Sequence, residues 1–233
     1  MPHDPPGLVL HMHPLASYCW KVLIALYEEG TPFEKAQIDG LPKENRSYAE
    51  LWPIAKMPLL QDGDRTVPES SIIIEYLQDH YPGPARLIPA AAEAAREVRL
   101  WDRFFDLYVH TPMQKFVSDR LRPEGAKDPA GVADAAAALD TAYAMLERRM
   151  ATRAWVAGDA FSMADCAALP PLFYAQAAHP YRAAHPALAE YVERLLLRPS
   201  VQRVIGEAQP WLQYFPFAEA LEPRFLSAPA GQA

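Results

Sequence analysis

Cysteine is scarce in this chain, which has only Cys19 and Cys166 among its 233 residues. Two thiols so far apart in the sequence do not make a disulfide framework, so a reducing compartment is the simpler interpretation. No CxxC pair occurs, which argues against a structural zinc site. We therefore expect neither disulfides nor a bound metal.

Long apolar runs are missing as well. No run approaches the ~20 residues that a helix needs to cross a bilayer. The opening residues, MPHDPPGLVL, lack the basic segment and the apolar segment of a secretory signal. These absences predict a cytoplasmic protein without a membrane partner.

An excess of basic residues is also absent, since 22 Lys and Arg face 29 Asp and Glu for a net charge of -7. This balance opposes nucleic-acid binding, which requires concentrated positive charge. It leaves room for a small anionic ligand, because backbone N–H groups at a helix N-terminus can bind an anion on an acidic protein.

Strand patterns occur only in the first ~80 residues. Leu8–His13 reads as a strand, apolar residues then recur at helical spacing up to Gly30, and Phe33–Asp39 reads as a second strand. Residues 59–61 and 65–67 flank an Asp-Gly turn, which predicts a β-hairpin. A helix follows, with Ser70 and Ser71 as candidate N-caps. The predicted order is βαβ-ββα.

The run Tyr81-Pro82-Gly83-Pro84 is the best linker in the sequence, and only helical patterns follow it. We expect helices over 93–117, 130–152, from Ser162 onward, over 186–197 and over 201–209. Pro170 and Pro171 should kink or break the third. The predicted organisation is an α/β domain at 1–82, a linker at 83–92, an all-helical bundle at 93–226 and a tail at 227–233.

Four motifs carry further information. The first helix opens with SYCWKVLIAL at 17–26, and Met57-Pro58 precedes the hairpin. Pro68-Glu69-Ser70-Ser71 opens the next helix. In GDAFSMADC at 158–166, Ser162 and Asp165 form a capping box.

With this order of elements, the motifs resemble the cytosolic glutathione transferases over nearly the whole chain, and most of all serine-type, zeta- or theta-like bacterial members. The resemblance implies a thioredoxin-like N-terminal domain that binds glutathione and an all-helical C-terminal domain. It also implies a homodimer and glutathione as co-substrate, without a metal.

The resemblance assigns a role to each matching residue. Ser17 would stabilise the glutathione thiolate, although the usual catalytic position falls on Ala16, so backbone N–H groups are the alternative. A free thiol has a pKa near ~8.5, and donors aimed at its sulfur favour the nucleophilic thiolate. Glutathione would contact the residues that follow: Lys56, Met57, Pro58, Glu69 and Ser70.

Within that set, Met57 would present its backbone to the cysteinyl part, before a cis Pro58. Glu69 would meet the γ-glutamyl ammonium, and Ser70 the γ-glutamyl carboxylate. Lys56 would either pair with the glycyl carboxylate or be a solvated surface lysine.

The second substrate should bind beside the first helix of the bundle, where mixed aromatic and polar residues suit a small apolar electrophile. The candidates are Tyr108, His110, Met113 and Gln114. Cys19 should face elsewhere and be buried, because it lies three residues beyond the usual catalytic position. His11 and His13 either line the cleft or support the turn before Ser17.

These residues predict a glutathione S-transferase that directs the thiolate at an electrophilic carbon. Two alternatives stay open: a non-catalytic binding or scaffold protein with this fold, and a glutathione-dependent thiol reductase that uses Cys19.

Overall fold

The computed structural model of the chain describes residues 7–40 and 42–226. The predicted tail at 227–233 lies outside the described residues. The chain divides after Ile88 into an N-terminal unit and a C-terminal unit, and each is described by itself below.

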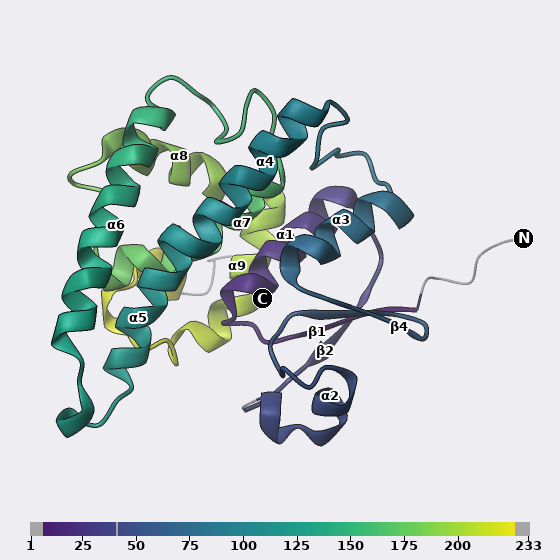
Figure 1. Ribbon diagram of the computed structural model, residues 1–233, viewed down its shortest axis with the longest axis horizontal. Coiled ribbons are helices and arrows are strands. Elements are labelled where there is room, and N and C mark those ends of the chain that lie inside the picture. Colours follow the sequence, from purple (N-terminus) through teal and green to yellow (C-terminus); the bar gives the residue numbers. More distant parts are fainter. Residues whose placement is uncertain (1–6, 41, 227–233) are drawn as a thin grey trace, which may run out of the picture. The chain divides into compact units, whose positions relative to one another are not determined.

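The N-terminal unit is a four-stranded sheet with helices on both faces (Figure 1). Its strands are β1 (Leu8–Met12), β2 (Glu34–Gln37), β3 (Leu59–Asp62) and β4 (Arg65–Pro68). Its helices are α1 (Ser17–Glu29), α2 (Arg46–Leu51) and α3 (Ser70–His80), with a 3-10 turn at Pro42–Glu44. The predicted α/β class of this unit is confirmed.

The strand order is β2-β1-β3-β4. β1 pairs with β2 in parallel, as a βαβ crossover requires, and β3 is antiparallel to both β1 and β4. His11 of β1 lies opposite Leu59 of β3, which in turn lies opposite Pro68 of β4. The end of β1, the start of β3 and the end of β4 therefore meet at one edge of the sheet.

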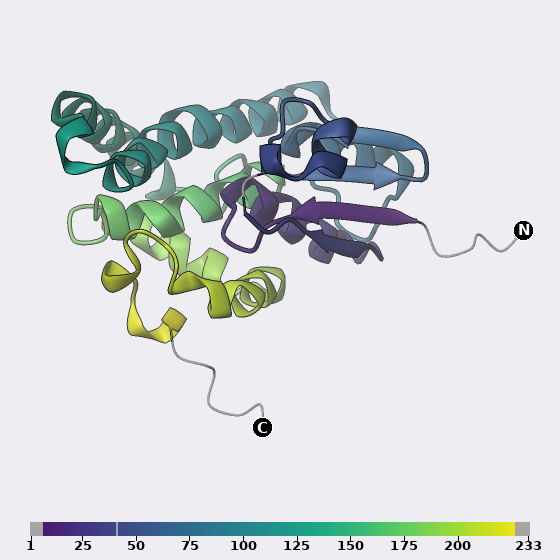
Figure 2. The same ribbon diagram turned by 90° about the horizontal axis from the view of Figure 1, so that it is seen from below.

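Side chains alternate along β1, as expected for a strand between two layers. Leu8, Leu10 and Met12 are buried, while Val9 and His11 point to the opposite face. α1 and α3 pack on each other on one face of the sheet, and α2 lies against the other face, which is turned to the viewer in Figure 2.

Helix α2 lies in a mostly polar segment for which the sequence predicts neither a helix nor a strand. Asn45 forms its N-cap, and the Asn45 side-chain oxygen accepts a hydrogen bond from the Tyr48 N–H at 3.1 Å. Tyr48, Ile38 and Leu59 then form a small core between α2 and the sheet. The short helix exists because this apolar contact supports it, which local polarity does not reveal.

In the C-terminal unit, the described residues form helices without a strand element, which confirms the predicted all-helical class. The main helices are α4 (Ala92–Phe104), α5 (Thr111–Arg120), α6 (Pro129–Met150), α7 (Met163–Ala178), α8 (Pro186–Leu196) and α9 (Pro199–Leu212). A short 3-10 turn, Glu124–Ala126, lies between α5 and α6, and two short helical turns follow α9, at Ala218–Ala220 and, as α10, at Pro223–Leu226. None of the helices in the described ranges has the length and apolarity to span a membrane.

The helix predicted over 93–117 is interrupted. Between α4 and α5, residues Phe105–His110 form a π-helical segment, in which the Thr111 N–H donates to the Asp106 carbonyl. Pro112 explains this widening, because proline has no N–H and its ring crowds the carbonyl one turn earlier. Pro112 was visible in the sequence. Whether it ends the helix or only widens it depends on the packing of α4 before it and α5 after it.

Pro170 and Pro171 were predicted to kink or break helix α7. The helix continues through both prolines to Ala178, so they do not break it. All of its residues except Gln176 and Ala178 are buried, so tertiary packing offsets the lost hydrogen bonds. The predicted capping box at its start is confirmed: the Asp165 carboxylate accepts from the Ser162 N–H and hydroxyl, both at 2.9 Å.

Candidate functional site

The edge of the N-terminal sheet brings three of the predicted segments together. Ser17 follows β1 by five residues, Met57-Pro58 immediately precedes β3, and Glu69-Ser70 immediately follows β4. Because neighbouring strands lie ~4.8 Å apart, the register His11–Leu59–Pro68 makes these segments neighbours.

Ser17 is the first residue of α1, and Ala16 is its N-cap. The Ala16 side chain cannot cap the helix, so the N–H groups of the first turn have no side-chain acceptor. Ser17 is 9% exposed, and its hydroxyl makes no hydrogen bond among the described residues. The start of α1 therefore combines a hydroxyl with the positive end of the helix dipole.

The turn before α1 is held by His13. The His13 Nδ1 atom accepts from the Leu15 N–H at 3.1 Å, and the His13 carbonyl accepts from the Ala16 N–H at 3.0 Å. Burial lowers the pKa of His13, and the Asp39 carboxylate opposes this shift. Of the two open roles, these contacts favour support of the turn. His11 instead bonds to Gln61 through its Nε2 and lies beside the Tyr48 ring.

Cys19 is fully buried. Burial raises the pKa of its thiol to about 12, although a hydrogen bond to the His13 backbone opposes the shift. A thiol with this pKa carries almost no thiolate at neutral pH, so Cys19 is a poor nucleophile. This agrees with the prediction that it packs as an apolar residue.

The loop from Trp52 to Pro58 runs from α2 to β3. The peptide bond between Met57 and Pro58 is cis, as the resemblance predicted. Within residues 7–40 and 42–226, no hydrogen bond is recorded for the backbone N–H or C=O of Met57. A free donor and a free acceptor on one residue can pair with an extended peptide ligand, as an edge strand does. Lys56 is exposed and has no ion pair in the described ranges.

Glu69 occupies a strained backbone position. Its φ of 71° lies in the left-handed region that favours glycine, yet it forms the N-cap of α3. Such strain often marks a ligand site, because nearby structure must hold it in place. The Glu69 side chain is exposed, and Ser70 is buried at the first position of the helix. Ser70 and Ser71 were expected as N-caps, but no side chain caps α3.

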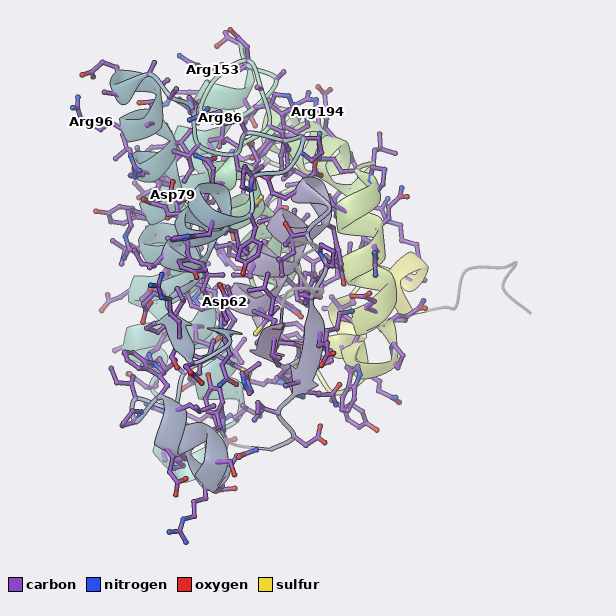
Figure 3. The ribbon with its side chains drawn as sticks, turned by 90° about the vertical axis from the view of Figure 1, so that its right-hand side faces the viewer. Asp62, Asp79, Arg86, Arg96, Arg153 and Arg194 are labelled. Carbon is purple, nitrogen blue, oxygen red and sulfur yellow. The ribbon has the colours of Figure 1, made fainter. Side chains whose placement is uncertain are left out.

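The C-terminal half of α3 is tied to the hairpin by two hydrogen bonds. Asp62 at the end of β3, labelled in Figure 3, accepts hydrogen bonds from the hydroxyls of Tyr76 and Tyr81 at 2.6 and 2.7 Å. Hydrogen bonds from these two hydroxyls lower the pKa of Asp62, so its carboxylate stays charged. Helix α3, which begins directly after Glu69, is therefore anchored to the end of β3.

Lys21 was missed as a functional candidate. It is 1% exposed, and its Nζ donates to the Ser71 Oγ at 2.9 Å, which links α1 to the first turn of α3. A buried lysine requires hydrogen-bonded partners to offset its desolvation. The only signal in the sequence was a charged residue inside the apolar run of α1.

The second-substrate candidates lie in the C-terminal unit. Tyr108 and His110 belong to the π-helical segment, where Tyr108 is 58% exposed and contacts the Phe104 ring. Met113 is buried in α5, and Gln114 is exposed on the same helix. π-Helical segments are frequent at functional sites. Among the described residues, no group of three or more His, Cys, Asp or Glu could hold a metal ion.

Two family models match this chain. The model for the glutathione S-transferase N-terminal domain matches residues 10–85, and that for the glutathione S-transferase C-terminal domain matches residues 129–194. Glutathione S-transferase 3 of Zea mays is 31% identical over 209 residues, which cover 85% of this chain and 93% of the maize protein.

Solved structures with the same fold include two bacterial proteins. A glutathione S-transferase from Rhodospirillum rubrum is 26% identical with a TM-score of 0.75, over 85% of this chain and 91% of that one. One from Methylobacillus flagellatus, solved with glutathione bound, is 24% identical with a TM-score of 0.78, over 85% and 98% of the two chains.

Proposed function

Because the chain belongs to the glutathione S-transferase family, we propose that the sheet edge of its N-terminal unit is the site that binds glutathione and activates its thiol. The enzymatic activity is that of a glutathione S-transferase. In this reaction the sulfur of the thiolate attacks an electrophilic carbon and a C–S bond forms. Either the bond to a leaving group breaks and the group departs with its electron pair, or the π bond at that carbon breaks, its electron pair moves to the neighbouring atom and a proton is taken up.

The observation that carries the proposal is the convergence at this edge of polar groups that have no partner in the described part of the chain. The Met57 backbone offers a donor and an acceptor for the cysteinyl residue of glutathione. The exposed Glu69 carboxylate suits the γ-glutamyl ammonium, and Ser70 at the start of α3 suits the γ-glutamyl carboxylate. Lys56 is the candidate partner of the glycyl carboxylate, and Pro58 shapes the loop.

Ser17 is the candidate stabiliser of the thiolate. Its hydroxyl and the N–H groups of the first turn of α1 can both donate to the sulfur, and the helix dipole favours the anion. Positioning and anion stabilisation then supply the rate, and the enzyme forms no covalent intermediate.

The electrophile is proposed to be a small, partly apolar molecule. Tyr108, His110, Met113 and Gln114 combine apolar and polar groups suited to such a substrate. The homodimer and the cytoplasmic location remain predictions.

The thiol-reductase alternative is disfavoured by Cys19. A fully buried thiol whose pKa is raised to about 12 by burial does not readily exchange with a disulfide. No other cysteine occurs in the N-terminal unit, since Cys166 belongs to α7.

Isothermal titration with reduced glutathione tests the site. We expect saturable binding by the wild type and an affinity at least about tenfold weaker for Glu69→Ala, or ~1.4 kcal/mol. Glu34→Ala is the matched control, because Glu34 is an exposed glutamate of the same unit on β2. Equal affinity of Glu69→Ala and wild type would reject Glu69 as a ligand, and no wild-type binding at millimolar glutathione would reject the site.

A further inference from the structure

The loop that carries Met57 rests on a small core of its own. Tyr48 of α2 is 1% exposed and packs with Ile38 and Leu59 between α2 and the sheet. Trp52 and Met57, from the two ends of the loop, pack against this core. The position of the loop therefore depends on α2 as well as on β3.

Tyr48 also contacts the loop through its hydroxyl. The Tyr48 Oη donates a hydrogen bond to the Lys56 carbonyl oxygen at 2.6 Å. Burial raises the pKa of this phenol, so it keeps its proton and acts as a donor at any physiological pH. The ring itself is held in place, because it lies 5.6 Å from the His11 ring on the same face of the sheet.

The Lys56 carbonyl shares one peptide group with the Met57 N–H. This peptide bond is not among the cis bonds of the described chain, so its C=O and N–H point in opposite directions within one plane. A hydrogen bond that fixes the direction of the oxygen therefore fixes the direction of the N–H. That N–H is the donor without a partner in the described ranges.

We propose that Tyr48 is a positioning residue for glutathione, whose hydroxyl orients the Lys56–Met57 peptide so that the Met57 N–H faces the cysteinyl carbonyl of the ligand. This role rests on the proposed function. It acts through the backbone and not through contact with the substrate.

Few other hydrogen bonds in the described chain hold the loop around the Lys56–Met57 peptide group. Within the loop, the recorded backbone bonds run from the Trp52 N–H to the Tyr48 carbonyl at 3.0 Å and from the Ala55 N–H to the Trp52 carbonyl at 2.8 Å. Both lie before Lys56. Ala55 has a φ of 52°, so the chain reverses there without a glycine. Loss of the Tyr48 hydrogen bond would leave the peptide group between Lys56 and Met57 free to rotate, between the turn at Ala55 and the cis bond to Pro58.

The substitution Tyr48→Phe isolates the hydroxyl, because the ring and its packing are retained. We expect the KM for glutathione to rise about fivefold while kcat at saturating glutathione changes less than twofold, since a positioning defect weakens binding before it slows chemistry. In the absence of ligand, peptides that cover residues 52–58 should take up deuterium faster in Tyr48→Phe than in the wild type. The steady-state assay varies glutathione against an aryl halide.

Tyr143→Phe is the matched control. Tyr143 is also 1% exposed, and its hydroxyl also donates to a backbone carbonyl, that of His179 at 3.2 Å in the C-terminal unit. It should lower the melting temperature about as much as Tyr48→Phe but leave the KM for glutathione unchanged.

The outcomes separate the two proposals. A wild type that binds glutathione, together with Tyr48→Phe at an unchanged KM and unchanged deuterium uptake, would overturn the role of Tyr48 alone. An equal rise of KM in both variants would also overturn it, because the effect would follow from general destabilisation. A wild type that binds no glutathione would overturn the site itself and with it the role of Tyr48 in binding.

Discussion

At the scale of single residues, the proposed thiolate site depends on how helix α1 begins. Ser17 sits at the first position of α1, and the preceding Ala16 offers no side-chain cap. A serine at the N-cap would use its oxygen to accept from the helix N–H groups. Ser17 is one residue later, so its hydroxyl stays available as a donor. Both the hydroxyl and the uncapped N–H groups can then face an anion.

We predict that Ser17→Ala raises the pKa of enzyme-bound glutathione by about 1 unit, the equivalent of a ~1.4 kcal/mol hydrogen bond to the thiolate. At a pH below the pKa of glutathione bound to the wild type, kcat/KM of the variant should be about tenfold lower than that of the wild type. The pKa can be followed by the ultraviolet absorbance of the bound thiolate.

Ser47→Ala serves as its control, because Ser47 is an exposed serine of α2 in the same unit. If Ser17→Ala leaves both the pKa and the rate unchanged, the backbone N–H groups of α1 stabilise the thiolate without the hydroxyl.

At the scale of elements, α7 is organised from its first turn. The Asp165 carboxylate accepts from the Val156 N–H at 3.0 Å and from the Tyr191 hydroxyl at 2.7 Å, in addition to the two donors of Ser162. It is fully buried. One side chain thus joins the loop before α7, the start of α7 and helix α8, and all of its bonds are shielded from water.

We expect Asp165→Ala to lower the free energy of unfolding by about 3 kcal/mol, because it leaves several buried donors without an acceptor. The melting temperature should fall by about 9 °C in a chain of this size. Asp159→Ala, an exposed aspartate in the same loop, should change it by less than about 1 °C. A small effect of Asp165→Ala in thermal unfolding would mean that water replaces the carboxylate.

At the scale of the whole chain, ion pairs hold the short helix α10 against α8. Arg224 of α10 binds Glu193 of α8 through two bonds, of 2.6 and 3.0 Å, and Arg182 binds the same carboxylate. Glu222 contacts both arginines. The hydrogen bond from Arg224, followed by that from Arg182, lowers the pKa of Glu193 to about 2.

This pKa predicts a pH dependence of stability. A carboxyl whose pKa is lowered on folding stabilises the protein above its ordinary pKa of 4.5, and this contribution is lost as the pH falls toward about 2. At pH 7, Glu193→Gln should lower the melting temperature by about 3 °C, or ~1 kcal/mol, because partial exposure screens the pairs.

The difference in melting temperature between Glu193→Gln and the wild type should shrink as the pH falls from 4.5 to 2. It should also shrink at high salt. Glu190→Gln on the exposed face of α8 is the control and should show no such trend. A difference that stays constant over this pH range would assign the effect to packing instead of charge.

Much of the fold followed from local patterns in the sequence. The βαβ start, the Asp-Gly hairpin and the long helices depend on periodicity and turn residues that act within a few positions. The capping box of Ser162 and Asp165 is local in the same sense. The motif at Met57-Pro58 and the cis bond followed from the family resemblance, because composition does not distinguish one X-Pro bond from another.

Other features were decided only by tertiary structure. α2 forms because Tyr48 finds apolar partners on the sheet, α7 continues through two prolines because its surroundings are packed, and Lys21 is buried because it reaches Ser71 on α3. Each depends on residues distant in sequence whose approach lowers the free energy of a locally unfavourable arrangement. The sequence by itself determined which segments carry the polar groups of the proposed site. Strand pairing in space decided that these segments meet at one edge, because only the hydrogen-bonded register aligns the ends of β1, β3 and β4.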